Sequence, residues 1–145
     1  MTETKTPTPN ALWSIFTNKC PRCRRGKMFL NKNAYSKLTL KNIFDMPEKC
    51  EVCNQKYDME TGFWVGTSYV SYALTVALSV STFVAWFVLF GFGLNDNRIY
   101  WWLGLNALFL VLAQPWIMRL SRVLYIRFFV SYDSNYKNTE PKVFE

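Results

Sequence analysis

The sequence has no histidine among its 145 residues. Histidine changes charge closest to physiological pH, so the commonest general base and a common metal ligand are both missing. The chain also contains no nucleophile-elbow, phosphate-loop, dinucleotide-binding or HExxH motif. We therefore expect a protein that is not an enzyme.

Charge is missing from two long stretches of the chain. No Asp, Glu, Lys or Arg occurs from Thr61 to Asn95 or from Ile99 to Met118. A helix needs about 20 apolar residues to cross the hydrocarbon core of a bilayer, and each stretch is long enough. The sequence thus predicts a membrane α-helical hairpin, with two transmembrane helices at residues 68–94 and 99–120 joined by a turn at 95–98.

A secretory signal is also missing. Residues 1–18 form a polar, partly disordered tail without the apolar run of about 7–15 residues that such a signal requires. Residues 59–67 form the joint before the first span. Residues 121–132 predict an amphipathic helical extension, either the second helix leaving the membrane or a short interfacial helix. Residues 133–145 form a polar tail.

Cysteine is scarce and confined to one region. All four cysteines lie in two C-x-x-C pairs, Cys20 with Cys23 and Cys50 with Cys53, with 26 residues between the pairs. Four thiolates in this pattern can converge on one tetrahedral metal ion. We predict a small N-terminal zinc-ribbon head at residues 19–58 that binds one zinc per chain, with iron as the less favoured metal. Four thiolates leave no coordination position for water, so the metal is expected to be structural.

Local sequence around the cysteine pairs predicts further details. Gly26 is expected to adopt positive φ, and Asn54 is one of the few residue types other than glycine that tolerate it. Alternating polar and apolar residues from Ser36 to Leu40 predict one strand.

Basic residues are distributed unevenly about the two apolar spans. Eleven Lys and Arg precede the first span, five follow the second, and only Arg98 lies in the turn. Because positive residues stay on the cytoplasmic side, both termini and the cysteine head are expected to be cytoplasmic. That compartment is reducing and favours metal-bound thiolates over disulfides.

Basic residues beside the first cysteine pair form a candidate docking or lipid surface. They are Arg22, Arg24, Arg25 and Lys27. Anionic lipid attracts a basic residue near the membrane surface by about 1 kcal/mol. Membrane lipid is therefore the expected partner, a protein-docking face is the alternative, and no nucleic acid is expected.

Small and polar residues inside the apolar spans predict helix packing, because small side chains let helices approach closely in lipid. The predicted packing residues are Gly62, Gly66, Ser68, Ser71, Thr75, Ser79, Thr82, Asn106 and Gln114. Asn106 and Gln114 are expected to hydrogen-bond to the hydroxyl stripe of the first helix, and Pro115 is expected to kink the second helix. A polar conduction path is less favoured, because the spans carry no ionisable relay residue.

The order of these features is similar to that of one bacterial family. A CPxCxxG knuckle followed by a basic residue and phenylalanine (CPRCRRGKMF), a second C-x-x-C and two apolar spans closing in QPWIMRLSR resemble domain of unknown function 983. The resemblance covers Lys19 to Phe129, and Asn54 replaces the glycine that the family has after the last cysteine. It implies a small protein of the bacterial inner (cytoplasmic) membrane with a zinc-binding head and no established activity.

We weigh three functions for this architecture. The leading hypothesis is a non-enzymatic docking or assembly factor for a membrane complex, whose zinc ribbon contacts another membrane protein or a second copy of the chain. The alternative is a thiol-redox or metal-handling protein that uses the paired cysteines directly. An oligomeric membrane protein that moves a small solute is the second alternative.

Overall fold

A computed structural model describes residues 9–35, 45–91 and 97–142 of the chain. Within these ranges the protein is helical and has no strand. The helical elements are α1 (Ala11–Phe16), the 3-10 helix η1 (Phe63–Gly66), α3 (Thr67–Phe90) and α4 (Arg98–Phe129). The strand predicted at Ser36–Leu40 and the first half of the turn predicted at 95–98 lie outside the described residues.

Helix α3 follows the first apolar span. It contains neither glycine nor proline from Thr67 to Phe90, so nothing in its interior interrupts the helix. The chain enters it through Gly62, whose φ of 83° lies in the left-handed region that glycine adopts freely. It ends at Gly91, whose φ is 69° and whose N–H donates to the Phe87 carbonyl at 3.0 Å.

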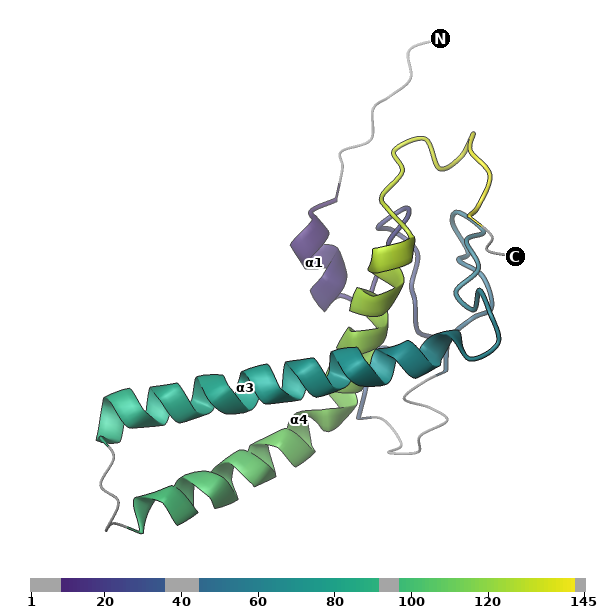
Figure 1. The fold of residues 1–145 in the computed structure, drawn as a ribbon. Coiled ribbons are helices and arrows are strands. Elements are labelled where there is room, and N and C mark those ends of the chain that lie inside the picture. The colour runs from purple at the N-terminus through teal and green to yellow at the C-terminus, as the bar shows by residue number, and fades with distance from the viewer. Residues whose placement is uncertain (1–8, 36–44, 92–96, 143–145) are drawn as a thin grey trace.

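Helix α4 is continuous through the second apolar span and most of the predicted extension. Its 32 residues run from Arg98 to Phe129, so the extension is the same helix and not a separate one. Pro115 lies inside α4, lacks an N–H and crowds the preceding turn. The helix changes direction about midway along its length (Figure 1), as expected at an internal proline.

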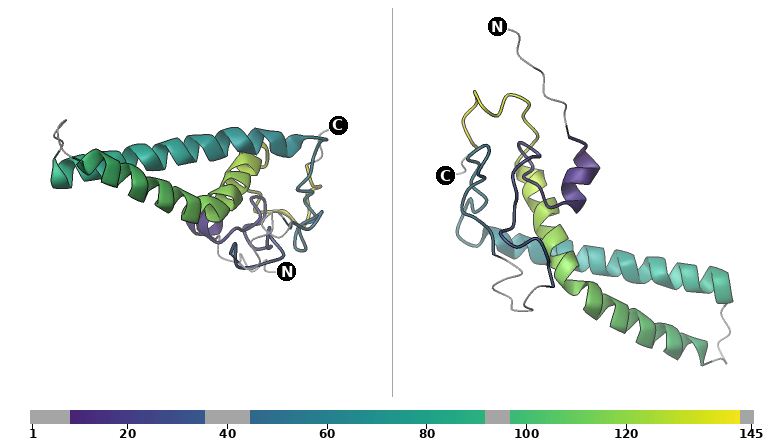
Figure 2. Two further views of the ribbon diagram at one scale, coloured as in Figure 1. Left: turned by 90° about the horizontal axis from the view of Figure 1, so that it is seen from below. Right: turned by 180° about the vertical axis from the view of Figure 1, so that it is seen from behind.

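The first half of α4 lies beside α3 and forms a hairpin with it in every view (Figures 1 and 2). Both helices are long and apolar enough to cross a membrane. Every residue of α3 after Thr67 is exposed or half-buried, although most of these side chains are apolar. Such a helix has too little protein around it to bury its apolar surface.

The second half of α4 forms the centre of a small head at one end of the hairpin. Its buried apolar side chains belong to Ile117, Leu120, Val123 and Ile126. Val123 and Ile126, together with Val130 just after the helix, belong to one core cluster with the four cysteines, Met28, Phe29 and Tyr57. The head loops gather around this part of α4 (Figure 2).

Arg119 fixes the head to α4 from within. It is 1 % exposed, its Nη1 donates to the carbonyl of Asn31 at 2.8 Å, and its guanidinium lies 4.9 Å from the ring of Phe29. Such hydrogen-bond partners offset the cost of burying the charged guanidinium. Arg119 is therefore a structural residue of the head.

Two terminal segments pack on this core. Helix α1 lies against α4, where Arg127 Nη2 donates to Ser14 Oγ at 2.8 Å and the rings of Phe16 and Trp116 stack at 6.3 Å. At the other end of the chain, residues 133–142 cross the cysteine loops and hydrogen-bond to them, so this part of the predicted polar tail is attached to the head.

Candidate metal centre

The four cysteines form one cluster at the centre of the head. Their Sγ atoms all lie within 4.8 Å of one another. The Sγ atoms of Cys20 and Cys53 are 3.7 Å apart, and so are those of Cys23 and Cys50. Four sulfurs placed about 2.3 Å from a tetrahedral zinc are about 3.8 Å apart, so the cluster fits that ion. The cluster can hold a metal ion, as the sequence predicts.

The two cysteine pairs sit on matching backbone turns. The N–H of Arg24 donates to the Cys20 carbonyl at 2.9 Å, and that of Asn54 donates to the Cys50 carbonyl at 3.0 Å. Both residues follow the second cysteine of their pair, and both adopt positive φ, 56° for Arg24 and 54° for Asn54. Each turn is closed by an antiparallel bridge, Lys19 with Lys27 and Lys49 with Lys56.

Gly26 has a different role from the one expected. It is not among the described residues with positive φ, and that conformation falls on Arg24. A Cβ at position 26 would overlap the Sγ of Cys50 and would lie 3.7 Å from that of Cys23. The Gly26 N–H donates to Cys23 Sγ at 3.4 Å. Glycine is required here because the backbone approaches the sulfurs closely.

The cysteines are shielded from solvent, with exposed fractions from 0 % at Cys20 and Cys50 to 5 % at Cys53. A hydrogen bond from Cys20 lowers the pKa of Cys23 to about 6, while hydrogen bonds with the other three thiols, Cys23 first, raise the pKa of Cys20. The cluster therefore favours thiolate at some positions near neutral pH, and thiolate is the form that binds metal.

Tyr57 and Gln55 support the cluster and were not singled out from the sequence. Tyr57 is 1 % exposed, and its hydroxyl donates to the Lys27 carbonyl at 3.2 Å, which ties the second cysteine loop to the first. Burial, followed by the nearby cysteines, raises the pKa of Tyr57. The side chain of Gln55 is also fully buried and pairs with the backbone of Lys142 in both directions, at 2.7 and 3.0 Å. The only signal in the sequence is their closeness to Cys53.

The candidate docking or lipid surface is only partly at the surface. Arg22 is 3 % exposed. Its Nη2 donates to the carbonyls of Thr139 at 2.6 Å and Glu140 at 2.8 Å, and it pairs with Asp133 at 3.6 Å. Arg22 is therefore not available on the predicted surface, because the C-terminal segment covers it.

The other three basic residues of that surface differ in exposure. Arg24 is half-buried, donates to the Pro9 carbonyl at 3.1 Å and lies 4.1 Å from the ring of Tyr132. Arg25 is also half-buried, while Lys27 is exposed. Lys27 is thus the one exposed residue of the four.

Seven of the predicted packing residues lie at two places between α3 and α4. Ser79 and Thr82 meet Asn106, which accepts from the Thr82 hydroxyl at 3.0 Å and donates to Ser79 Oγ at 3.4 Å. Ser68, Ser71, Thr75 and Gln114 line a cleft between α3 and α4. The five predicted packing residues of α3 thus lie along its side that faces α4, and Asn106 and Gln114 face them from α4.

The two glycines of the predicted packing motif differ from each other. A Cβ at Gly66 would overlap the ring and hydroxyl of Tyr125 on α4, so Gly66 lies at a close helix contact. Gly62 lies in the turn before η1, where a Cβ would meet only Val65 at 3.9 Å. Its role is the left-handed turn and not helix packing.

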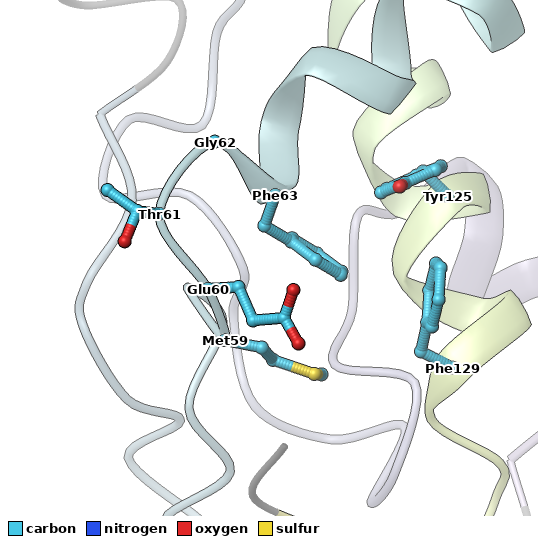
Figure 3. A pocket seen from close by; sticks show the side chains of 7 residues that line it. All are labelled: Met59, Glu60, Thr61, Gly62, Phe63, Tyr125 and Phe129. Atoms are coloured by element: carbon cyan, nitrogen blue, oxygen red, sulfur yellow. The ribbon is translucent and has the colours of Figure 1, made fainter. Parts of the chain in front are cut away.

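A second hollow of 290 Å³ lies between the joint and the end of α4. The rings of Phe63, Tyr125 and Phe129 pack against one another there, with centroids 5.0 to 5.2 Å apart (Figure 3). At these separations the rings fill the space between them. Glu60 and Met59 lie at the edge of the hollow. The three packed rings hold the joint at residues 59–67 against α4.

No family model, curated protein or solved structure gives a significant match to this chain. The family resemblance based on the CPRCRRGKMF and QPWIMRLSR motifs therefore stays a prediction, and the function has to be argued from the site itself.

Proposed function

We propose that this chain is a two-span protein of the bacterial inner membrane whose cytoplasmic head, a zinc ribbon, docks another membrane protein or a second copy of the chain during assembly of a membrane complex. The observation that carries the proposal is the closed cysteine cluster. All four ligands are thiols, all are buried, and no fifth donor or open position is needed to complete a tetrahedral site.

The geometry favours a structural metal over thiol chemistry. A redox or metal-delivering cysteine must be reached by its reaction partner, and such cysteines are partly exposed. Here Cys20 and Cys50 are fully buried, and Gly26 leaves no room beside the sulfurs. The bound ion would hold the two loops together while their outer surfaces remain available for contact.

Membrane placement rests on the hairpin and on the charge distribution. α3 and the first half of α4 expose apolar side chains along their whole length, and exposed aromatic residues mark both ends: Tyr69 and Tyr72 near the head, and Tyr100 and Trp101 at the far end. The head end carries most of the lysines and arginines. We therefore place the head in the cytoplasm, and the turn at residues 95–98 outside.

The outer surface of the cysteine loops is charged. Lys27, Glu51 and Lys56 are exposed on them, and Lys27 and Lys56 belong to the bridges that close the two turns. Surface charges contribute little to stability, so these residues can be changed without unfolding the head. They are the residues that we expect a partner to contact.

The test is in-membrane crosslinking of the full chain with the double variant Lys27→Glu/Lys56→Glu. We expect a several-fold loss of crosslinked partner with the zinc content near one per chain and with an unchanged amount of protein in the membrane. Lys137→Glu, an exposed lysine of the C-terminal segment, is the matched control and should leave crosslinking unchanged.

Unchanged crosslinking in the double variant would contradict docking through this surface. A mixed disulfide trapped at Cys23 or Cys53 in cells, together with isolated protein that lacks zinc, would instead support the thiol-redox function. Iron in place of zinc would change the metal but not the docking argument.

A further inference from the structure

A cleft of 530 Å³ lies between the beginning of α3 and the middle of α4. Its volume is within the range of small-ligand sites, about 300–1,000 Å³. Four of its lining residues are serines or threonines of α3, namely Thr67, Ser68, Ser71 and Thr75, and α4 contributes Ser121 and Arg122 among others. It is separate from the cysteine cluster, and the proposed docking function does not use it.

Arg122 supplies a positive charge at the head end of the cleft. Its guanidinium lies 4.7 Å from the ring of Trp64, which also lines the cleft, and its Nη1 donates to the sulfur of Met46 at 3.5 Å. Asp58 is the carboxylate whose charge acts on Arg122. Among the described residues that line the cleft there is no acid. Arg122 is thus the only charged residue of the described cleft lining, and its charge is positive.

The hydroxyl groups add hydrogen-bond acceptors beside this charge. Thr67 donates to the Trp64 carbonyl at 2.6 Å, and Ser121 donates to the Met118 carbonyl at 2.9 Å. Because their protons are used within the helices, their oxygens can accept hydrogen bonds from a ligand. The cleft thus combines one cation with several acceptors, which suits an anionic group that carries neighbouring hydroxyl or ammonium donors.

The two ends of the cleft differ in depth within the proposed bilayer. Trp64 and Arg122 lie at the head end, whereas Thr75 and Gln114 lie further along the apolar hairpin. Tyr72 lines the cleft between these levels and is 72 % exposed, as is typical of tyrosine at the headgroup level. A ligand that fits must be charged at one end and apolar at the other.

We propose that this cleft binds the head of a membrane phospholipid, with the phosphate beside Arg122, headgroup hydroxyl or ammonium donors on the hydroxyl oxygens, and acyl chains along the hairpin. Basic pockets between membrane helices on the cytoplasmic side bind lipid headgroups in this way. The inference rests on the membrane placement proposed above, but it needs neither the metal nor the docking partner.

The test is native mass spectrometry of the full chain in detergent with added dioleoylphosphatidylglycerol. We expect one lipid to remain bound, and Arg122→Gln to weaken its binding by about tenfold, as expected when a charge-assisted hydrogen bond is lost. Arg122→Lys keeps the charge and should retain most of the binding. Lys137→Gln removes an exposed charge of the C-terminal segment, away from the cleft and from the cysteine loops, and should change binding by less than about twofold.

A second variant guards against misfolding of Arg122→Gln. Ser68 is exposed at the rim of the cleft, so Ser68→Leu should fill the cleft, leave the charge in place and still weaken lipid binding while zinc content and helicity are unchanged. Equal lipid binding by the wild type, Arg122→Gln and Ser68→Leu would overturn the inference. So would displacement of the lipid by millimolar inorganic phosphate, which would show a site for free phosphate.

Membrane fractionation of the same variants separates the two proposals. Wild-type protein that stays in the membrane fraction but retains no lipid would overturn only the proposal that the cleft binds a phospholipid. Protein found in the soluble fraction would overturn the membrane placement on which it rests.

Discussion

The two halves of α4 pack in opposite ways. Before Pro115 the only buried residue of this helix is polar, Asn106, and the surrounding leucines and valines are exposed. From Pro115 onward the helix buries Ile117, Val123 and Ile126 in the core of the head. The apolar side chains of this helix are thus exposed in the hairpin and buried in the head. The change falls at Pro115.

This contrast shows that the two regions depend on different interactions. In the proposed bilayer the hydrophobic effect would not drive the two helices together, so the hairpin would rely on close packing and interhelical hydrogen bonds. The head lies outside the apolar spans and is stabilised by burying apolar side chains. A unit of this size, however, buries too little apolar surface to be stable through its core alone. A metal ion bound at the cysteine cluster would compensate for that small core.

The largest effect is expected from removing the metal. Cys50→Ser should lose the bound zinc and unfold the head, because structural zinc contributes about 10–16 kcal/mol of apparent binding free energy in small zinc domains. The helical hairpin should stay folded, since none of the four cysteines lies in it. Metal analysis should show less than one zinc per chain, and limited proteolysis should cut residues 19–58 while α3 stays protected.

Cys20→Ser should give the same result, because both cysteine pairs belong to one site. Full zinc content in both variants would show that the pairs do not share an ion. A head that stays protease-resistant without zinc would show that its core is sufficient alone and would remove the contrast between the two regions.

A smaller effect is expected where the two regions join. Gly66→Ala places a methyl group against the Tyr125 ring and should destabilise the packing of α3 on α4 by about 1–3 kcal/mol, the usual result of overpacking. Gly104→Ala is the matched control in the hairpin, since a Cβ there meets nothing within 4 Å. Thermal unfolding in detergent, followed by tryptophan fluorescence, should separate the two variants.

The Gly66 result can be checked for its cause. In the Tyr125→Ala background, Gly66→Ala should cost less stability than it does in the wild type, because the overlapping ring is already gone. Equal stability of the Gly66→Ala and Gly104→Ala variants would show that α3 and α4 are not in close contact at this point.

The sequence was sufficient for features whose cause is local. The C-x-x-C spacing within each pair predicted metal-binding turns, and the uncharged stretches predicted two long apolar helices, because both depend on residues near each other in the chain. That the two pairs, 26 residues apart, share one cluster was predicted from the four-thiolate chemistry of such sites. Positive φ at Asn54 was predicted from its residue type alone.

Features that depend on contacts between distant segments could not be predicted in this way. Arg22 is buried by residues more than a hundred positions away, and nothing in the CPRC motif indicates it. Arg119 has the spacing expected of a solvated helix face, yet it is buried against the loop that carries Asn31. The need for glycine at position 26 follows from Cys50, which only the folded head brings next to it.

The smallest effect tests the interior of the hairpin. Thr82→Val keeps the shape of the side chain and removes the hydroxyl that lies 3.0 Å from Asn106 Oδ1 and 2.9 Å from the Ser79 carbonyl of its own helix. Interhelical hydrogen bonds in membrane proteins contribute about 0.6 kcal/mol on average and about 1.7 kcal/mol at most, so the loss should lie in this range.

Ser81→Ala is the matched control, because Ser81 is exposed and its hydroxyl donates to the Ala77 carbonyl of the same helix at 2.7 Å. Unfolding of the full chain in mixed micelles should therefore place Thr82→Val below the wild type and Ser81→Ala close to it. If the two variants are equally stable, the polar residues inside the hairpin contribute nothing to helix pairing, and close packing alone must hold α3 against α4.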